Sequence, residues 1–119
     1  MKRMIAVVDD DIELLDSLEN LLESAGYVVR KFSSAKTLID TGLVGIDCLI
    51  TDIGMPAIDG FELYAFARKT RPELPVFLIT GRHEFGDRHH AGAKGVNGFF
   101  RKPFDWPALL AAIGSTLHK

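Results

Sequence analysis

The sequence predicts an α/β protein, a three-layer (βα)5 sandwich in which helices cover both faces of a five-stranded parallel sheet. Short apolar runs, which are typical of buried strands, occur at residues 4–8, 27–29, 48–51, 76–79 and 96–100. Segments with helix signals lie between most of them, and this alternation implies parallel strands joined by right-handed crossovers. The chain has 119 residues, of which 47% are hydrophobic, so it suffices for one domain with one core.

The first strand, residues 4–8, contains no polar residue, as expected for a strand that is covered on both faces. Asp9, Asp10 and Asp11 end it, and we expect Asp11 to be only a residue of the helix start. The next segment has apolar residues at helical spacing, namely Leu14, Leu15, Leu18, Leu21, Leu22 and Ala25. Gly26 suits the C-terminal end of this helix.

Two further helices are predicted on either side of the third strand. Ser33 or Ser34 is suited to cap a short helix that ends near residue 42. A longer helix is expected over residues 60–70, and Pro72 stops it.

The stretch that follows the fourth strand, residues 82–94, has two glycines, three histidines and little apolar periodicity. We expect a short or poorly ordered helix there. Its polar residues are of types that bind transition metals: His83, Glu84, Asp87, His89 and His90. Because no ordered scaffold is predicted to hold them, we expect a solvated loop rather than a metal site.

The last helix is predicted to begin at Asp105, which caps it. Its apolar residues are Leu109, Leu110, Ile113 and Leu117. Phe104 and Trp106 suit either contacts with a partner or packing of this helix, and the sequence does not separate the two.

Charge and cysteine content exclude some classes of protein. Lys and Arg number 14 and Asp and Glu 16, for a net charge of −2, which argues against a surface built mainly to bind nucleic acid. Cys48 is the only cysteine, so no internal disulfide is possible, which fits a reducing compartment. The apolar run at residues 4–8 is too short for a signal peptide or a membrane span, so we expect a cytoplasmic protein with no membrane contact.

Polar residues follow four of the predicted strands. Asp9 and Asp10 follow the first strand, Asp52 ends the third, Thr80 the fourth, and Lys102 follows the fifth. In a parallel sheet these positions share one edge, which is where ligands bind. Carboxylates this close would repel and raise one another's pKa, so they need a cation; oxygen ligands with room for water suit Mg²⁺.

A carboxylate with Mg²⁺, a lysine and a hydroxyl beside it is equipped to accept a phosphoryl group. Aspartate is a known nucleophile in phosphoryl transfer, where catalysis is mostly positioning and charge neutralisation. Asp52 is the candidate acceptor. Lys102 and the Thr80 hydroxyl would each contact an oxygen of the transferring group.

The same residues form motifs that resemble the response-regulator receiver domain of two-component signalling. The motifs are Val8-Asp9-Asp10, Asp52 with Met55-Pro56 and Asp59-Gly60, Thr80-Gly81, and Lys102-Pro103-Phe104. The match runs from about residue 4 to residue 118, so residues 1–119 are expected to form a single receiver domain. The resemblance implies a flavodoxin-like sheet of strand order 2-1-3-4-5. It also implies that Asp52 takes phosphate from a sensor histidine kinase or a phosphotransfer protein and then alters the face shown to an output partner or output domain.

The resemblance also assigns roles to the metal ligands. Asp10, Asp52 and the backbone carbonyl of Gly54 would bind Mg²⁺ directly, and Asp9 would act through a metal-bound water. Gly54 also leaves one side of the acceptor without a side chain, so we expect water to reach the phosphoryl group and its lifetime to be short.

The remaining roles concern the switch. Lys102 would pair with the phosphoryl group, Thr80 would move to hydrogen-bond it, and Phe99 would be the coupled aromatic residue, where a tyrosine is often found. The Lys102–Pro103 bond resembles the family's usual cis peptide.

Two other functions are alternatives to the switch. A small Mg²⁺-dependent phosphatase would use Asp52 as a turnover nucleophile, but Gly54 stands where a second acid-base carboxylate would be expected. A phosphate-independent interaction module of the same fold is opposed by the intact set of polar residues. We therefore expect a protein that catalyses only its own phosphorylation and dephosphorylation and is otherwise not an enzyme.

Overall fold

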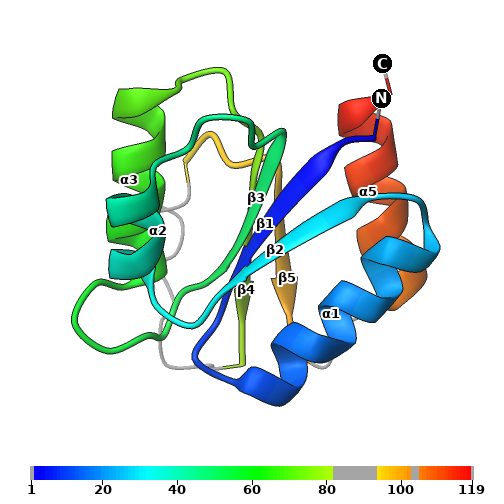
Figure 1. Ribbon diagram of the computed structural model, residues 1–119, viewed down its shortest axis with the longest axis horizontal. Helices are drawn as coiled ribbons and strands as arrows, with labels where there is room; N and C mark the ends of the chain where they lie inside the picture. Colours follow the sequence, from blue (N-terminus) through cyan, green and yellow to red (C-terminus); the bar gives the residue numbers. More distant parts are fainter. Residues whose placement is uncertain (1, 82–93, 103–104, 119) are drawn as a thin grey trace.

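A five-stranded parallel sheet of order β2-β1-β3-β4-β5 runs through the middle of the molecule, so the predicted fold class and strand order are confirmed (Figure 1). The structure is a computed structural model that describes residues 2–81, 94–102 and 105–118. The strands are β1 (Met4–Val8), β2 (Val28–Phe32), β3 (Cys48–Asp52), β4 (Val76–Thr80) and β5 (Gly98–Arg101).

Four helices are described, and they cover both faces of the sheet. They are α1 (Ile12–Ser24), α2 (Ala35–Thr41), α3 (Gly60–Thr70) and α5 (Trp106–Leu117). Figure 1 shows α2 and α3 on one side of the sheet and α1 and α5 on the other. The predicted irregular stretch over residues 82–94 lies outside the described residues except for Lys94, and so do the histidines at positions 83, 89 and 90.

The middle strands are buried because both of their faces are covered. All five residues of β3 and all five of β4 are buried. Successive side chains of a strand point to opposite faces, so one strand serves two cores. In β1, Ala6 and Val8 pack with the α2 and α3 side, while Ile5 and Val7 pack with the α1 and α5 side.

Short polar side chains begin each described helix. Asp11 accepts a hydrogen bond from the Leu14 amide at 3.2 Å, and Asp105 accepts one from the Ala108 amide at 3.1 Å. Ser34, rather than Ser33, caps α2. These caps satisfy amides that have no partner within the helix, and they set where α1, α2 and α5 begin.

Strand ends differ from prediction by a few residues. The second strand is Val28–Phe32 rather than residues 27–29, because Arg30 and Lys31 continue the pairing with β1. These charged residues are tolerated because β2 is an edge strand. The fifth strand begins at Gly98 rather than residue 96, and Asp52 and Thr80 lie within β3 and β4.

In the described part of the chain, no helix is long and apolar enough to span a membrane.

Candidate functional site

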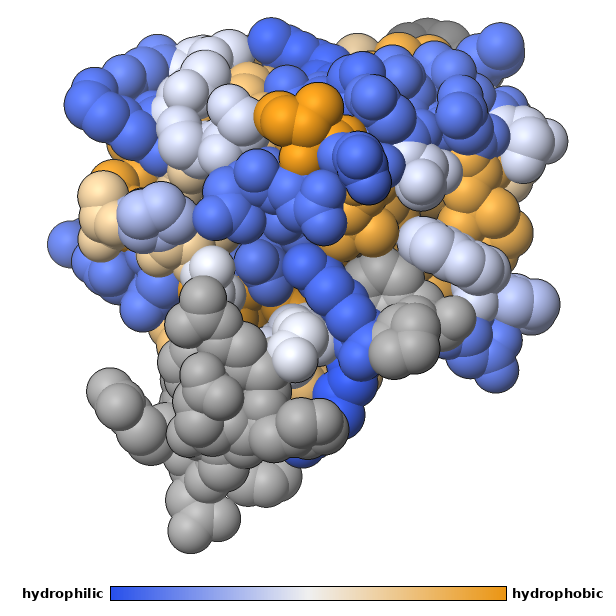
Figure 2. All heavy atoms as spheres, turned by 90° about the horizontal axis from the view of Figure 1, so that it is seen from below, coloured by the Kyte–Doolittle hydropathy of each residue, from blue (hydrophilic) through white to orange (hydrophobic). Residues whose placement is uncertain are grey.

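The polar residues that follow the strands do meet at one edge of the sheet. Val8 is paired with Thr51, which places Asp9 beside Asp52 at the carboxyl ends of β1 and β3. On the other side of β4, the Lys102 amide donates to the Thr80 carbonyl at 2.7 Å, which carries the lysine back to the same edge. Figure 2 shows this end of the molecule, where hydrophilic residues cover the middle of the face.

Three carboxylates form the centre of the site. Oxygen atoms of Asp9, Asp10 and Asp52 all lie within 4.8 Å of one another. Asp9 and Asp52 are buried and Asp10 is exposed. One member of the cluster therefore remains open to solvent and to an incoming ion.

The Lys102 side chain faces two of these carboxylates. The Lys102 ammonium lies 2.9 Å from Asp9 Oδ2 and 3.7 Å from Asp52 Oδ1. Asp9 Oδ1 accepts a hydrogen bond from the Asp11 amide at 2.9 Å. Both oxygens of Asp9 are thus engaged, and Lys102 is paired first with Asp9 and only at longer range with Asp52.

Burial and crowding perturb both buried carboxylates. The pKa of Asp52 is raised to about 6, chiefly by burial and then by the negative charge of Asp9, while Lys102 opposes the rise. Burial also raises the pKa of Asp9, against the hydrogen bonds from the Asp11 amide and Lys102. Among the described residues, one ammonium group faces three acidic groups, so negative charge exceeds positive charge in this cluster.

A cavity of about 320 Å³ opens onto this cluster. Its lining residues are Asp9, Asp10, Asp11, Asp52, Gly54, Gly81 and Lys102. A Cβ atom at Gly81 would lie 3.4 Å from Lys102 Cδ, so the missing side chain leaves room for the stem of the lysine. The sequence did not predict the contact of Gly81 with Lys102 or the hydrogen bond from the Asp11 amide. The one sequence signal for the Gly81 contact is the glycine that directly follows Thr80.

The donor set fits Mg²⁺. All the side-chain donors are carboxylate oxygens, which hard divalent cations prefer, and the cavity has room for the water molecules that Mg²⁺ retains. The excess negative charge is what a divalent cation would neutralise. Gly54 also lines the cavity, as its predicted role as a carbonyl ligand requires.

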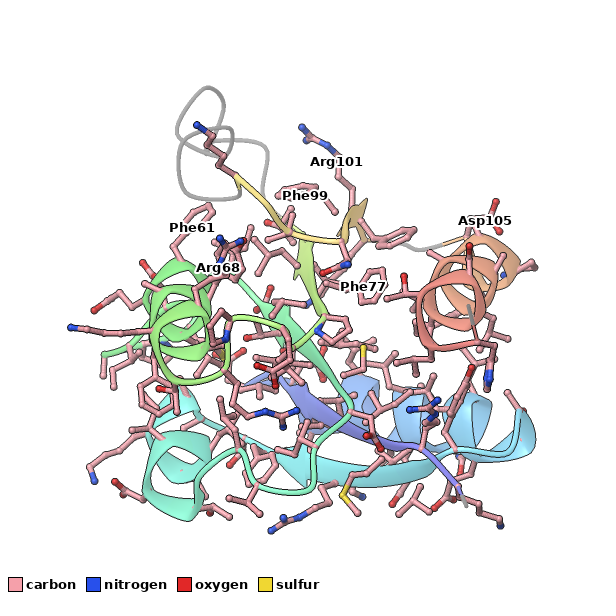
Figure 3. The ribbon with its side chains drawn as sticks, turned by 90° about the horizontal axis from the view of Figure 1, so that it is seen from above. Phe61, Arg68, Phe77, Phe99, Arg101 and Asp105 are labelled. Atoms are coloured by element: carbon pink, nitrogen blue, oxygen red, sulfur yellow. The ribbon has the colours of Figure 1, made fainter. Side chains whose placement is uncertain are left out.

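The predicted switch residues lie beside the cluster rather than in it. Thr80 is buried at the end of β4, one residue before Gly81. Phe99 on β5 is half-buried and packs against the core on the α2 and α3 side. Figure 3 shows Phe99 at the edge of the sheet, next to the strand that carries Phe77 and on the side of Phe61 in α3. The Lys102–Pro103 bond and Phe104 involve residues outside the described part of the chain.

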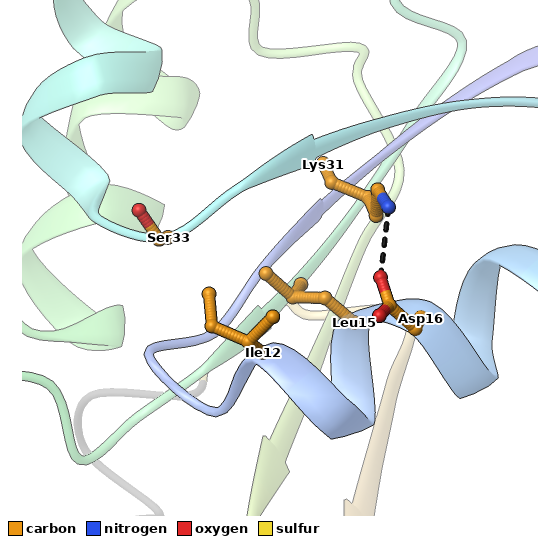
Figure 4. Close-up of a pocket in the computed structure, with 5 residues that line it drawn as sticks. All are labelled: Ile12, Leu15, Asp16, Lys31 and Ser33. Carbon is orange, nitrogen blue, oxygen red and sulfur yellow. Dashed lines mark hydrogen bonds and ion pairs between the residues drawn. The ribbon is translucent and has the colours of Figure 1, made fainter.

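A second, smaller cavity of about 230 Å³ lies between α1 and β2 (Figure 4). Its lining residues are Ile12, Leu15, Asp16, Lys31 and Ser33. Lys31 pairs with Asp16 at 2.8 Å and with Glu19 at 2.9 Å, and these bonds raise the pKa of the lysine. These ion pairs connect α1 to the edge strand β2. The acidic residues lie at the start of the same helix.

Comparison with known proteins agrees with this architecture. Residues 5–114 match the family described as response regulator receiver domain. The transcriptional regulatory protein FixJ of Bradyrhizobium diazoefficiens is 34% identical over 120 residues, which cover 99% of this chain and 58% of that protein. The chain therefore spans little more than half the length of this relative.

Two solved structures superpose closely on the molecule. A CheY-like receiver domain protein of Methanospirillum hungatei has a TM-score of 0.89 at 28% identity and covers 99% of this chain and 95% of its own. The DrrB receiver domain activated with BeF₃ has a TM-score of 0.88 at 26% identity and covers 100% of both chains.

Proposed function

Because the chain belongs to the response regulator receiver domain family, we propose that it accepts a phosphoryl group on Asp52 and acts as a phosphorylation-dependent signalling switch. The family is one of receiver domains rather than conventional enzymes. The phosphoryl donor would be a sensor histidine kinase or a phosphotransfer protein. The recipient of the signal would be an output partner or an output domain, and residues 1–119 would act as one receiver unit.

One observation supports this function most directly. The Asp52 carboxylate is buried at the end of β3 and lies within 4.8 Å of the Asp9 and Asp10 carboxylates. The Lys102 ammonium is 3.7 Å away. A buried carboxylate with excess negative charge around it is a poor structural element, because desolvated charges of like sign repel. The same arrangement suits a nucleophile that works with a divalent cation.

These positions support a direct transfer step. An Asp52 oxygen attacks phosphorus, the P–N bond of the phosphohistidine breaks, and its electron pair returns to the imidazole nitrogen. Lys102 would pair with an oxygen of the transferred group. A bound Mg²⁺ would neutralise charge on the phosphoryl oxygens. Asp10, Asp52 and the Gly54 carbonyl would hold it directly, and Asp9 through a water molecule.

The response to phosphorylation would begin at the end of β4. We propose that the Thr80 hydroxyl turns to the phosphoryl group and that Phe99, on the neighbouring strand, changes position with it. Thr80 and the lysine that contacts the acceptor are already joined, since the Lys102 amide donates to the Thr80 carbonyl. Such a change would shift the population between two conformations of the β4 and β5 edge.

The test is phosphorylation by a small donor. Wild type and Asp52→Asn are incubated with Mg²⁺ and acetyl phosphate, or with Mg²⁺ and beryllofluoride, and followed by intact mass and NMR. A gain of one phosphoryl group in wild type that Asp52→Asn loses is the expected result. No adduct would favour a phosphate-independent module, and steady release of phosphate from unrelated monoesters would favour a phosphatase.

A further inference from the structure

Thr51 carries a hydroxyl that the packing of β3 does not explain. The residue is fully buried, and its partners in register on β1 and β4 are Val8 and Leu78, both of the core on the α2 and α3 side. A valine would fill nearly the same volume without bringing a polar atom into apolar surroundings, where a hydroxyl is costly unless it is hydrogen-bonded. The hydroxyl is therefore unfavourable for packing alone, and its hydrogen bond is the property that a valine lacks.

The hydroxyl donates to the main chain of the proposed phosphoryl acceptor. Thr51 Oγ1 lies 3.0 Å from the carbonyl oxygen of Asp52, and this hydrogen bond is buried. The register of β1 with β3 ends at Val8 and Thr51, so Asp52 lies one residue beyond that pairing. The Thr51 side chain thus holds the Asp52 carbonyl where the pairing with β1 has stopped.

The other end of the same peptide unit contacts the nucleophile. The Ile53 amide donates to the Ile79 carbonyl at 2.9 Å. Burial is the main cause that raises the pKa of the Asp52 carboxyl, and a hydrogen bond from the Ile53 amide acts against this rise. Because a peptide unit is planar, its C=O and N–H groups turn together. The hydrogen bond that holds the Asp52 carbonyl therefore also sets the direction of the amide that faces the Asp52 carboxylate.

The start of α3 encloses this peptide unit from another side. A Cβ atom at Gly60 would overlap the Asp52 carbonyl oxygen, and the Gly60 amide donates to the Ile53 carbonyl at 2.9 Å. Successive side chains of a strand point to opposite faces, so the Thr51 hydroxyl lies on the face away from the Asp52 carboxylate. Thr51 can act on the carboxylate only through the main chain.

We propose that Thr51 is a positioning residue for phosphoryl transfer: its hydroxyl fixes the peptide unit between Asp52 and Ile53, and this unit orients the Asp52 carboxylate for attack on phosphorus. This inference rests on the proposed function, because it takes Asp52 to be the acceptor. Thr51 touches no reacting atom, so loss of its hydroxyl should lower the maximal rate of transfer and leave the binding of the phosphoryl donor nearly unchanged.

The experiment compares wild type with Thr51→Val, which removes the hydroxyl, and Thr51→Ser, which keeps it. Phosphorylation by acetyl phosphate at saturating Mg²⁺ is followed by intact mass over a range of donor concentrations. We expect Thr51→Val to lower the maximal rate about tenfold, because a misplaced reacting group loses rate steeply. The donor concentration at half the maximal rate should stay the same, and Thr51→Ser should restore most of the rate.

Thr116→Val is the matched control. The Thr116 hydroxyl also donates to a main-chain carbonyl, that of Ala112 at 2.9 Å, but it does so within α5, and Thr116 does not line the acidic cavity. We expect this variant to be phosphorylated at the wild-type rate. If Thr51→Val does not fold, Thr51→Ser and Thr51→Ala make the same comparison, because these two variants differ only in the hydroxyl oxygen.

A second measurement requires no phosphoryl donor. Hydrogen exchange of the Ile53 amide is compared with that of the Leu49 amide, which donates to the Pro75 carbonyl at 2.9 Å in the same strand. Thr51→Val should speed the exchange of Ile53 several-fold relative to Leu49, since the peptide unit is freed locally, and Thr51→Ser should reverse the change. An unchanged ratio of the two exchange rates would show that the hydroxyl does not hold this peptide unit.

The kinetic outcomes separate this inference from the proposed function. A Thr51→Val protein that is phosphorylated on Asp52 at the wild-type maximal rate overturns the positioning role alone. A serine variant as slow as the valine variant does the same, because the hydroxyl is then not the cause. A wild-type protein that gains no phosphoryl group on Asp52 overturns the proposed function, and the positioning role with it.

Discussion

Gly60, the first residue of α3, lies so close to Asp52 that a Cβ atom there would overlap the Asp52 carbonyl oxygen. The same atom would lie 2.7 Å from Ile53 Cα. The Gly60 amide donates to the Ile53 carbonyl at 2.9 Å, so the start of α3 is attached to the chain that leaves β3. The main chain that carries the acceptor carboxylate is thus held from one side by a glycine.

Gly60→Ala should therefore disturb the acceptor as well as the fold. Main-chain atoms cannot move aside as a flexible side chain would, so we expect a loss of about 1–3 kcal/mol in the free energy of unfolding and slower phosphorylation. Urea denaturation and the rate with acetyl phosphate measure the two effects. Gly114→Ala is the control, because its Cβ would meet only the Tyr27 hydroxyl, at 3.9 Å, and should be neutral or stabilising. Equal effects of the two substitutions would contradict the proposed contact.

Asp52→Asn is predicted to stabilise the cation-free protein at neutral pH. The folded state raises the pKa of Asp52 from 3.8 to about 6, so between these values the folded state binds more protons than the unfolded state. Stability then falls as the pH rises through this window, and the cost remains in full above pH 6. Asparagine escapes this cost, which is on the order of 3 kcal/mol.

Denaturation in the presence of a chelator at several pH values checks the sign. The advantage of Asp52→Asn should be largest at pH 7, shrink below pH 6 and nearly vanish at pH 4. A variant that is less stable than wild type at pH 7 would show that the carboxylate is well compensated in the folded state.

Mg²⁺ should stabilise the wild-type protein, since a ligand that binds only the folded state shifts unfolding by mass action. The gain is about 2.7 kcal/mol at a concentration one hundred times the dissociation constant. Asp52→Asn and Asp10→Asn should lose most of this gain, because each removes a proposed ligand. The melting temperature measured with Mg²⁺, and with NaCl at the same ionic strength, separates binding from screening. Equal stabilisation by the two salts would exclude a specific site.

The polar residues at the edge of the sheet could be predicted from the sequence, because their positions depend only on where each strand ends along the chain. Apolar runs that end in Asp9, Asp52 and Thr80 place polar groups at the ends of parallel strands, and parallel strands share one edge. The order of the strands could not be predicted in this way, because the alternation of strands and helices alone permits several orders. It was predicted from the resemblance to the receiver family, and the pairing of β1 with both β2 and β3 confirms it.

Individual contacts between side chains could not be predicted from the sequence. The pattern places Lys102 near the carboxylates, but it does not distinguish Asp9 from Asp52 as the partner, because less than an ångström separates the two contact distances. The length of β2 was missed for a related reason. Arg30 and Lys31 interrupt the apolar run, yet an edge strand exposes such residues without cost, and Lys31 finds two carboxylates on α1.

The last prediction concerns Gly54, which follows Asp52 by two residues and lines the cavity. A residue without a side chain leaves the phosphoryl group open to water on this side, so hydrolysis of the phosphoprotein should be fast. Gly54→Met would cover the group with a flexible apolar chain and exclude water, and we expect the phosphoprotein to live several-fold longer. Gly54→Ala is the graded control, since a methyl group is too short to cover the phosphoryl oxygens. Decay of the phosphorylated form after removal of the donor, followed by gel shift, gives the three lifetimes. A wild-type lifetime of many hours, or one lifetime shared by all three proteins, would show that water reaches phosphorus by another route.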